Sequence, residues 1–256
     1  MAMGRIAAIA GLTFRQALRE KVLYLLIAAG AIFILVSVAI SLLTVGDEVK
    51  IIKDLGLASV ALTGALVALL VGAGCVALEV ERRTLLILFS KPVARWEVVV
   101  GKFLGVLALA LTNVVVLTLL LEIVIWWRTG ALQPQLLTAA ALSAVEVVLL
   151  TAFAVLFSCF SSQMVSGIFG LGIYLIGHFA DGLSLLQEKV SGSAALGVRL
   201  LILLLPNLER FNVRAEVVHR LALPGAQVAL AVGYGLSYAG FVLLLTILLF
   251  RRRNFT

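Results

Sequence analysis

The chain has 256 residues, of which 63% are hydrophobic and 13% charged, with a mean hydropathy of +1.19 and a formal net charge of +7. Soluble domains contain about 45–50% apolar and about 25% charged residues, so this composition excludes a soluble globular domain. It also argues against a nucleic-acid-binding protein, because the basic residues form short clusters between apolar runs, as suits contact with anionic lipid headgroups.

The first predicted element is an amphipathic stretch, Phe14–Tyr24, ahead of the first apolar run. Three basic residues on it, Arg15, Arg19 and Lys21, are spaced to reach lipid headgroups while the apolar residues face the acyl chains. We therefore predict an interfacial N-terminal helix. The alternative is a charged flank that only sets the orientation of the chain.

Six apolar runs follow, and most have the roughly 20 residues that a helix needs to cross the hydrocarbon core. Strict alternation of apolar and polar residues is absent, so the spans are predicted to be helices rather than strands. We therefore predict one transmembrane domain, 1–256, in an all-α integral membrane protein with six transmembrane helices. The predicted spans are 22–45, 55–78, 103–125, 136–160, 165–179 and 226–250.

Small residues recur at helix-contact spacing in three of these spans. Such residues let two helix backbones approach closely, so we expect helix contacts at these positions. They are Gly64, Ala68 and Gly72 in the second span, Ser166 and Gly170 in the fifth, and Gly235 and Ala239 in the sixth.

The segment 79–102, between the second and third spans, combines charged residues with an apolar run, Leu85–Phe89. A solvated tether would not need this run, so its presence predicts docking to a partner or to the membrane surface. Proline fixes φ and resists continuation of a helix. The segment is therefore predicted to form a short helix, Arg82–Phe89, followed by a turn at Lys91-Pro92.

The segment 181–225 is predicted to be a large outer loop before the last span. Within it, 194–205 is apolar but short for a span, and Arg199 interrupts it. We predict a short external helix lying on the membrane. The alternative is a seventh span, which would place the C-terminus outside.

Lysine and arginine are unequally distributed between the two sides of the predicted spans. With the N-terminus inside, the densest basic clusters, 82–102 and 251–253, fall in cytoplasmic segments. Trp126 and Trp127 then lie at the outer end of the third span, where interfacial aromatic residues are common. We therefore predict a multi-pass protein of the plasma (inner) membrane with cytoplasmic N- and C-termini.

Glu146 lies near the middle of the fourth predicted span, where a charged side chain costs at least about 2.5 kcal/mol. It is therefore expected to face a partner or a wet cavity. Two interpretations stay open: the carboxylate lines a translocation path, or it is hydrogen-bonded at a helix contact or protonated. Glu122 lies nearer the interface and is expected to pair with Arg128.

No catalytic, metal or cofactor site is predicted. Gly101-Lys102 lacks the upstream glycine of a phosphate-binding loop, and neither cysteine has a second Cys or a His nearby. Ser166 and His178 are about 18 Å apart along one predicted helix, which is too far for a catalytic pair.

The pattern Glu-x-Glu-Arg-Arg-Thr-Leu…Ser-Lys-Pro-Val-x-Arg…Gly-Lys at 79–102 resembles the cytoplasmic loop of ABC-2 type transporter permeases. It is similar to the permease of nitrous-oxide reductase maturation systems. The resemblance extends over the whole chain, from the basic N-terminus through six spans and a large outer loop to the basic tail. Arg83 stands where the family usually has Gly.

The resemblance implies that the chain is one half of an ABC transporter, and we expect this transporter to be an exporter. Two permease subunits, identical or different, would form the pathway, and two separate ATPase subunits would dock on a coupling helix within 79–102. The missing phosphate-binding loop agrees with an energy source on another chain. The residues implied in docking and coupling are Glu79, Glu81, Arg82, Arg83, Leu86, Phe89, Lys91, Pro92 and Arg95.

Two other classes of function fit the sequence. One is a membrane anchoring or assembly protein that transports nothing, and the other is an ion-coupled secondary transporter that uses Glu146. Co-purification of an ATPase separates the ABC permease from both. Inverted repeats, which would favour a secondary transporter, are not evident in the sequence.

Overall fold

The computed structural model describes residues 2–44, 47–81, 94–180, 182 and 205–252. Five of its helices are long and apolar enough to cross a membrane, and a sixth, Gln163–His178, is apolar but shorter. An all-α membrane protein is thereby confirmed. The helical elements are α1 (Ala2–Leu18), α2 (Lys21–Ser41), α3 (Glu48–Glu81), α5 (Arg95–Thr129), α6 (Pro134–Ser158), α7 (Gln163–His178), η1 (Glu209–Phe211), α10 (Arg214–Val218) and α11 (Gly225–Arg252).

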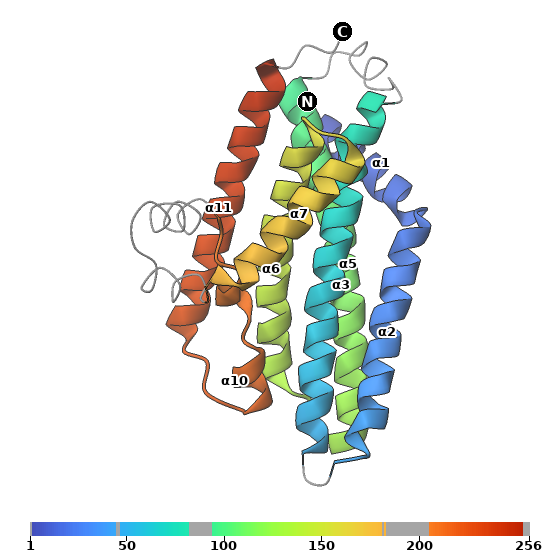
Figure 1. Cartoon of the computed structure of the whole chain (residues 1–256), viewed down its shortest axis with the longest axis vertical. Helices are drawn as coiled ribbons and strands as arrows, with labels where there is room; N and C mark the ends of the chain where they lie inside the picture. Colours follow the sequence, from blue (N-terminus) through green and yellow to red (C-terminus); the bar gives the residue numbers. More distant parts are fainter. Residues whose placement is uncertain (1, 45–46, 82–93, 181, 183–204, 253–256) are drawn as a thin grey trace.

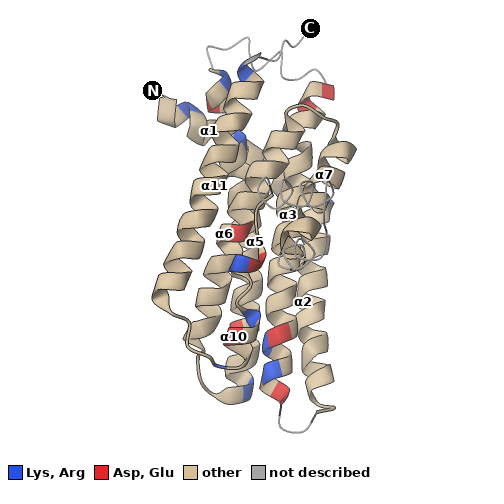
Figure 2. Cartoon of the chain, turned by 60° about the vertical axis from the view of Figure 1, so that its left-hand side comes forward, with Lys and Arg blue, Asp and Glu red and all other residues tan. Residues whose placement is uncertain are grey.

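The helices form a bundle in which α3 contacts α2, α5, α6 and α7, while α11 lies along α6 and α5 (Figure 1). The end of α3, the start of α5, the end of α11 and α1 lie at the same end of the bundle, which we call the loop end (Figure 1). The opposite end is called the far end. Figure 2 shows charged residues at both ends and a small group about halfway along.

The predicted helix contacts at small residues are present in the bundle. A Cβ atom at Gly64 would lie 2.9 Å from Val114, and one at Gly72 would lie 2.6 Å from Ala154 Cβ. A Cβ at Gly170 would likewise meet Leu69. These glycines therefore allow α3 to approach α5, α6 and α7 more closely than larger residues would.

The N-terminal helix differs from the predicted stretch Phe14–Tyr24. α1 ends at Leu18 and α2 begins at Lys21, so the predicted stretch is divided between two helices. The cause is packing, because α1 lies along α5 with Thr13 and Ala17 buried. The contacts with lipid headgroups stay a prediction for three exposed residues, Arg15, Arg19 and Lys21.

Gly105 of α5 provides the closest approach to α1. A Cβ atom there would lie 2.6 Å from Thr13 Cβ and 2.7 Å from the carbonyl oxygen of Ala10. Gly105→Ala is therefore expected to displace α1 and to lower the unfolding temperature of the purified protein in detergent. The matched control is Gly11→Ala, because a Cβ at Gly11 meets nothing within 4 Å.

Alanine has the higher helix propensity, so Gly11→Ala should stabilise the protein by up to about 1 kcal/mol. The same substitution is thus expected to act with opposite sign at the two positions. Equal shifts in unfolding temperature would contradict the tight α1–α5 contact.

α7 is shorter than a complete span. Its 16 residues extend about 24 Å, compared with about 30 Å for the hydrocarbon core. It ends at His178 about halfway along the bundle (Figure 1). The remaining depth on this side of α6 is occupied by a later part of the chain, 205–218.

The segment 205–218 packs against α6 and α3, and its residues Leu208, Phe211 and Val217 are buried. Part of the predicted outer loop 181–225 is therefore packed against the bundle, and the placement of the loop outside the membrane stays a prediction. This burial explains why a segment outside the predicted spans contains so many apolar residues. Most of the helix predicted at 194–205 lies outside the described residues.

Candidate functional site

The loop end carries both ends of the predicted docking segment 79–102. Glu79 and the exposed Glu81 belong to the last turn of α3, and Arg95 is the first residue of α5. The other residues predicted to act in docking lie outside the described residues; they are Arg82, Arg83, Leu86, Phe89, Lys91 and Pro92.

Lys102 joins α5 to the last turns of α3. Its side chain is 3% exposed, and its Nζ lies 2.7 Å from Oε1 of Glu79. The same Nζ donates a hydrogen bond of 2.6 Å to the carbonyl oxygen of Cys75. A buried ammonium group is stable only when it is paired in this way. The contact therefore fixes the end of α3 against α5.

Ser158, the last residue of α6, contacts the same part of α3. Its Oγ accepts hydrogen bonds of 2.9 Å from the backbone N–H groups of both Val76 and Ala77. In a regular helix each N–H points along the axis to the carbonyl four residues earlier. Two consecutive amides of α3 therefore share the Ser158 hydroxyl group, which ties the end of α6 to the end of α3.

The start of α5 is tied to α1 and α11. The Glu97 carboxylate accepts a hydrogen bond of 2.9 Å from the N–H of Ala94 and lies 3.7 Å from Nη1 of Arg5. Arg95 donates a hydrogen bond of 2.9 Å from Nη1 to the carbonyl oxygen of Arg251. A cation at the C-terminal end of a helix is favourable because unpaired carbonyls gather there.

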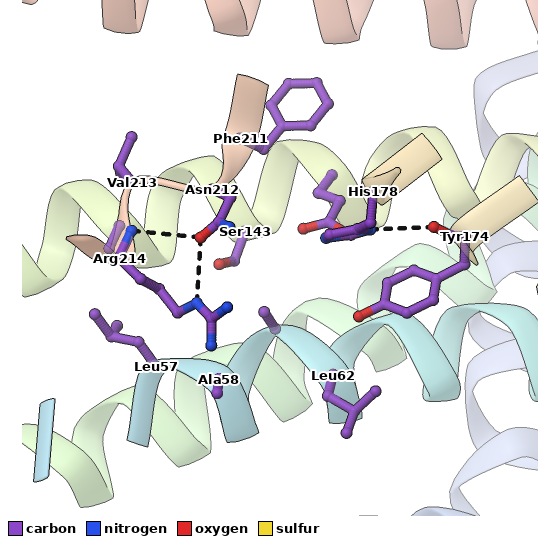
Figure 3. Close-up of a pocket in the computed structure, with 13 residues that line it drawn as sticks. Leu57, Ala58, Leu62, Ser143, Tyr174, His178, Phe211, Asn212, Val213 and Arg214 are labelled. Carbon is purple, nitrogen blue, oxygen red and sulfur yellow. Dashed lines mark hydrogen bonds and ion pairs between the residues drawn. The ribbon is translucent and has the colours of Figure 1, made fainter. Parts of the chain in front are cut away.

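A second region of interest is a cavity of about 210 Å³ between α3, α6, α7 and the segment 205–218 (Figure 3). The wall contributed by α3 is apolar and includes Leu57 and Leu62. The polar lining residues come from the other elements; they are Ser143, Glu146, Tyr174, His178, Asn212 and Arg214.

Glu146 is 4% exposed and faces this cavity rather than lipid. Its Oε1 has no hydrogen-bond partner in the described part of the chain and lies 3.6 Å from Nε2 of His178. Nδ1 of His178 lies 3.1 Å from the carbonyl oxygen of Tyr174 (Figure 3). On the other side of the cavity, Nε of Arg214 donates a hydrogen bond of 3.2 Å to Oδ1 of Asn212.

The predicted pair between Glu122 and Arg128 is wrong. Oε1 of Glu122 accepts a hydrogen bond of 2.7 Å from the N–H of Gln133, and Nη1 of Arg128 lies 3.9 Å from Oε2 of Glu48. Residues six apart on a helix differ by about 120° in direction, so the two side chains face different neighbours.

Sequence patterns did not reveal the roles of Lys102 and Ser158. A signal exists for Lys102, because a lysine within a long apolar helix requires a partner, and Glu79 ends the preceding span. Ser158 carries no comparable signal, since serine is common in membrane helices and hydrogen-bonds equally well within its own helix.

The fold and these two regions define a multi-pass helical membrane protein with charged residues at the loop end (Figure 2) and a cavity lined by both apolar and polar residues. The family profile described as "ABC-2 family transporter protein" matches residues 7–255, and the chain belongs to this family. No curated protein matches the chain. The chain is thus a membrane permease subunit of the ABC transporter class, and its family implies association with an ABC ATPase. The finer resemblance to the nitrous-oxide reductase maturation permease is not confirmed.

Proposed function

We propose that the chain is the permease half of an ABC exporter that is driven by a separate cytoplasmic ATPase docked on 79–102. The observation that carries this proposal is the anchoring of both helices that flank the segment 82–93. Lys102 and Ser158 hold the end of α3, and Arg95 and Glu97 hold the start of α5.

These anchors favour transmission of force. An ATPase without membrane spans acts on the permease only through the part of the chain that it touches. Because α3 and α5 are bonded to α1, α6 and α11 at the loop end, displacement of the docking segment moves several helices together. A flexible tether between free helix ends would absorb the same displacement locally.

The translocation path is proposed to form between this chain and a second permease subunit. The exposed apolar faces of α2 and α11 are free in the single chain and suit contact with lipid or with that subunit. Glu146 is proposed to line the path, since it is buried from lipid and faces a cavity with other polar residues.

The proposed function is tested by purifying the chain from its native membrane in mild detergent and identifying the proteins that accompany it. We expect a P-loop ATPase in stoichiometric amount, with ATP hydrolysis that is lost when the permease is removed. Absence of any ATPase would contradict the proposal and favour an anchoring protein or a secondary transporter. Transport driven by an ion gradient without ATP would favour the secondary transporter.

The orientation of the chain is a separate prediction. Single cysteines at Ser90 and Ser191, introduced into a variant without Cys75 and Cys159, should label differently with an impermeant thiol reagent. The residue at 191 should react on intact cells, and the residue at 90 should react only after the membrane is opened. The basic residues at the loop end, including Arg95 and those of α1, motivate this expectation. The reverse labelling pattern would overturn both the orientation and the docking of a cytoplasmic ATPase.

A further inference from the structure

Glu146 and His178 face one another in the cavity at the middle of the bundle. Their facing atoms, Oε1 and Nε2, are 3.6 Å apart. The carboxylate is almost completely buried, and Oε1 has no hydrogen-bond partner in the described ranges. A buried carboxylate oxygen without a donor is strongly unfavourable, so the arrangement requires a further group or a proton.

The hydrogen bond of His178 to the backbone identifies which ring nitrogen carries hydrogen. Nδ1 lies 3.1 Å from the carbonyl oxygen of Tyr174, and a carbonyl oxygen only accepts hydrogen bonds. Nδ1 is therefore the protonated nitrogen of the neutral ring, and Nε2 carries a lone pair. Consequently the lone pair of Nε2 is directed at Oε1 of Glu146, which is also an acceptor.

Two acceptors at this distance repel each other unless a proton lies between them. We propose that Glu146 and His178 together form a proton-binding site that holds one proton inside the membrane. The proton is held either as a carboxylic acid that donates to Nε2 or as an imidazolium that donates to Oε1. In both forms the pair has no net charge, which is the condition that a buried site in apolar surroundings favours.

The surroundings of the pair contain few other charges. From α7 the cavity receives the Tyr174 hydroxyl group, and from α6 it receives Ser143, while the lining residues of α3 are apolar. The segment 205–218 contributes Arg214, and Glu209 of the same segment lies within electrostatic range of Glu146. These two charges have opposite sign, so the proton on the pair controls the net charge of the cavity.

This site does not rest on the proposed ATP-driven transport. It belongs to the chain alone and is complete within α6 and α7. Release of the proton leaves one negative charge in the cavity. The affinity of the cavity for any charged solute therefore depends on pH. The competing arrangement is a water molecule that donates to both Oε1 and Nε2, which would leave Glu146 ionised and His178 neutral.

The test uses the purified chain in lipid nanodiscs with isotope-labelled histidine and no ATPase. The chain contains two histidines, and His219→Gln removes the exposed one, so nitrogen NMR then reports on His178 alone. At neutral pH we expect a protonated Nδ1. We also expect either a protonated Nε2 or, by infrared spectroscopy, a protonated carboxyl band that Glu146→Gln removes. Both spectra are recorded with Glu146 in place, and Glu146→Gln serves only to assign the carboxyl band.

Glu146→Gln supplies the second measurement, because it keeps the size and hydrogen-bonding capacity of the side chain. Groups that share a proton titrate together, so this variant should change the pH dependence of the Nε2 signal. Three results would overturn the proposal: hydrogen on Nε2 with none on Nδ1, an ionised Glu146 beside a neutral His178, or a titration that Glu146→Gln leaves unchanged. None of these results bears on ATPase association, so failure here is distinct from failure of the proposed function.

Discussion

Leu86→Asp is expected to release the cytoplasmic ATPase from the solubilised complex. Apolar anchors dominate the affinity of protein interfaces, whereas charges at the rim mainly affect orientation and association rate. Loss of one apolar anchor lowers the binding free energy of an interface by about 2 kcal/mol or more, which corresponds to about 30-fold weaker binding. Leu86 belongs to the apolar run Leu85–Phe89, so an aspartate there should abolish co-purification while the spans stay folded. Glu81→Ala, at the exposed rim, should have a smaller effect.

The experiment is a pull-down of the ATPase in detergent, where no bilayer remains. Leu132→Asp is the matched control, because Leu132 is 69% exposed in the α5–α6 connection at the far end. This control should retain the ATPase in full. If Leu86→Asp also keeps its ATPase and its transport-linked hydrolysis, the assignment of 79–102 to coupling is wrong. Retention of the ATPase by the Leu86→Asp protein in detergent would instead favour a segment that lies on the lipid surface.

Lys102→Met is expected to destabilise the protein by about 2 kcal/mol, because it removes two charged hydrogen-bonding contacts of a buried ammonium group. Lys102 is 3% exposed and bonds both Glu79 and the carbonyl oxygen of Cys75. Its loss frees the last turns of α3 from α5. We therefore expect a lower unfolding temperature and faster hydrogen exchange at the end of α3, together with weaker coupling of ATP hydrolysis to transport.

The control for this substitution is Lys50→Met. Lys50 also forms an ion pair, with Asp47 at 2.6 Å, but both side chains are at least half exposed. Solvent screens such a pair, so the unfolding temperature should stay nearly unchanged. The double variant Lys102→Met/Glu79→Gln should recover part of the lost stability. A Lys102→Met protein as stable as the parent chain would show that this buried pair does not hold α3.

The sequence was sufficient to predict the class of fold, because the hydropathy of each helix can be read from its own residues. The long apolar runs of α2, α3, α5, α6 and α11 satisfy the bilayer requirement independently of their neighbours. The small residues Gly64 and Gly72 also predicted close helix contacts, since a missing side chain is visible in the sequence.

Contacts between residues that are distant in sequence could not be predicted in the same way. α1 packs on α5 at Gly105, and the segment 205–218, which is distant in sequence, packs on the part of α6 that α7 does not reach. The desolvation argument predicted that Glu146 avoids lipid, but periodicity could not show that His178 is its neighbour. For the docking segment, the family resemblance supplied the residues, and the structure describes only the anchors on either side.

The packing of 205–218 has a consequence for the order in which the protein is assembled. The N–H of Asn207 donates to the hydroxyl group of Tyr234, and a Cβ at Gly235 would meet the ring of Phe211. Both partners belong to α11, which the ribosome makes after this segment. Non-helical backbone at membrane depth needs protein or water around its polar groups. The segment therefore cannot complete its packing when α7 enters the membrane, and this side of the bundle must close after the last helix has been inserted.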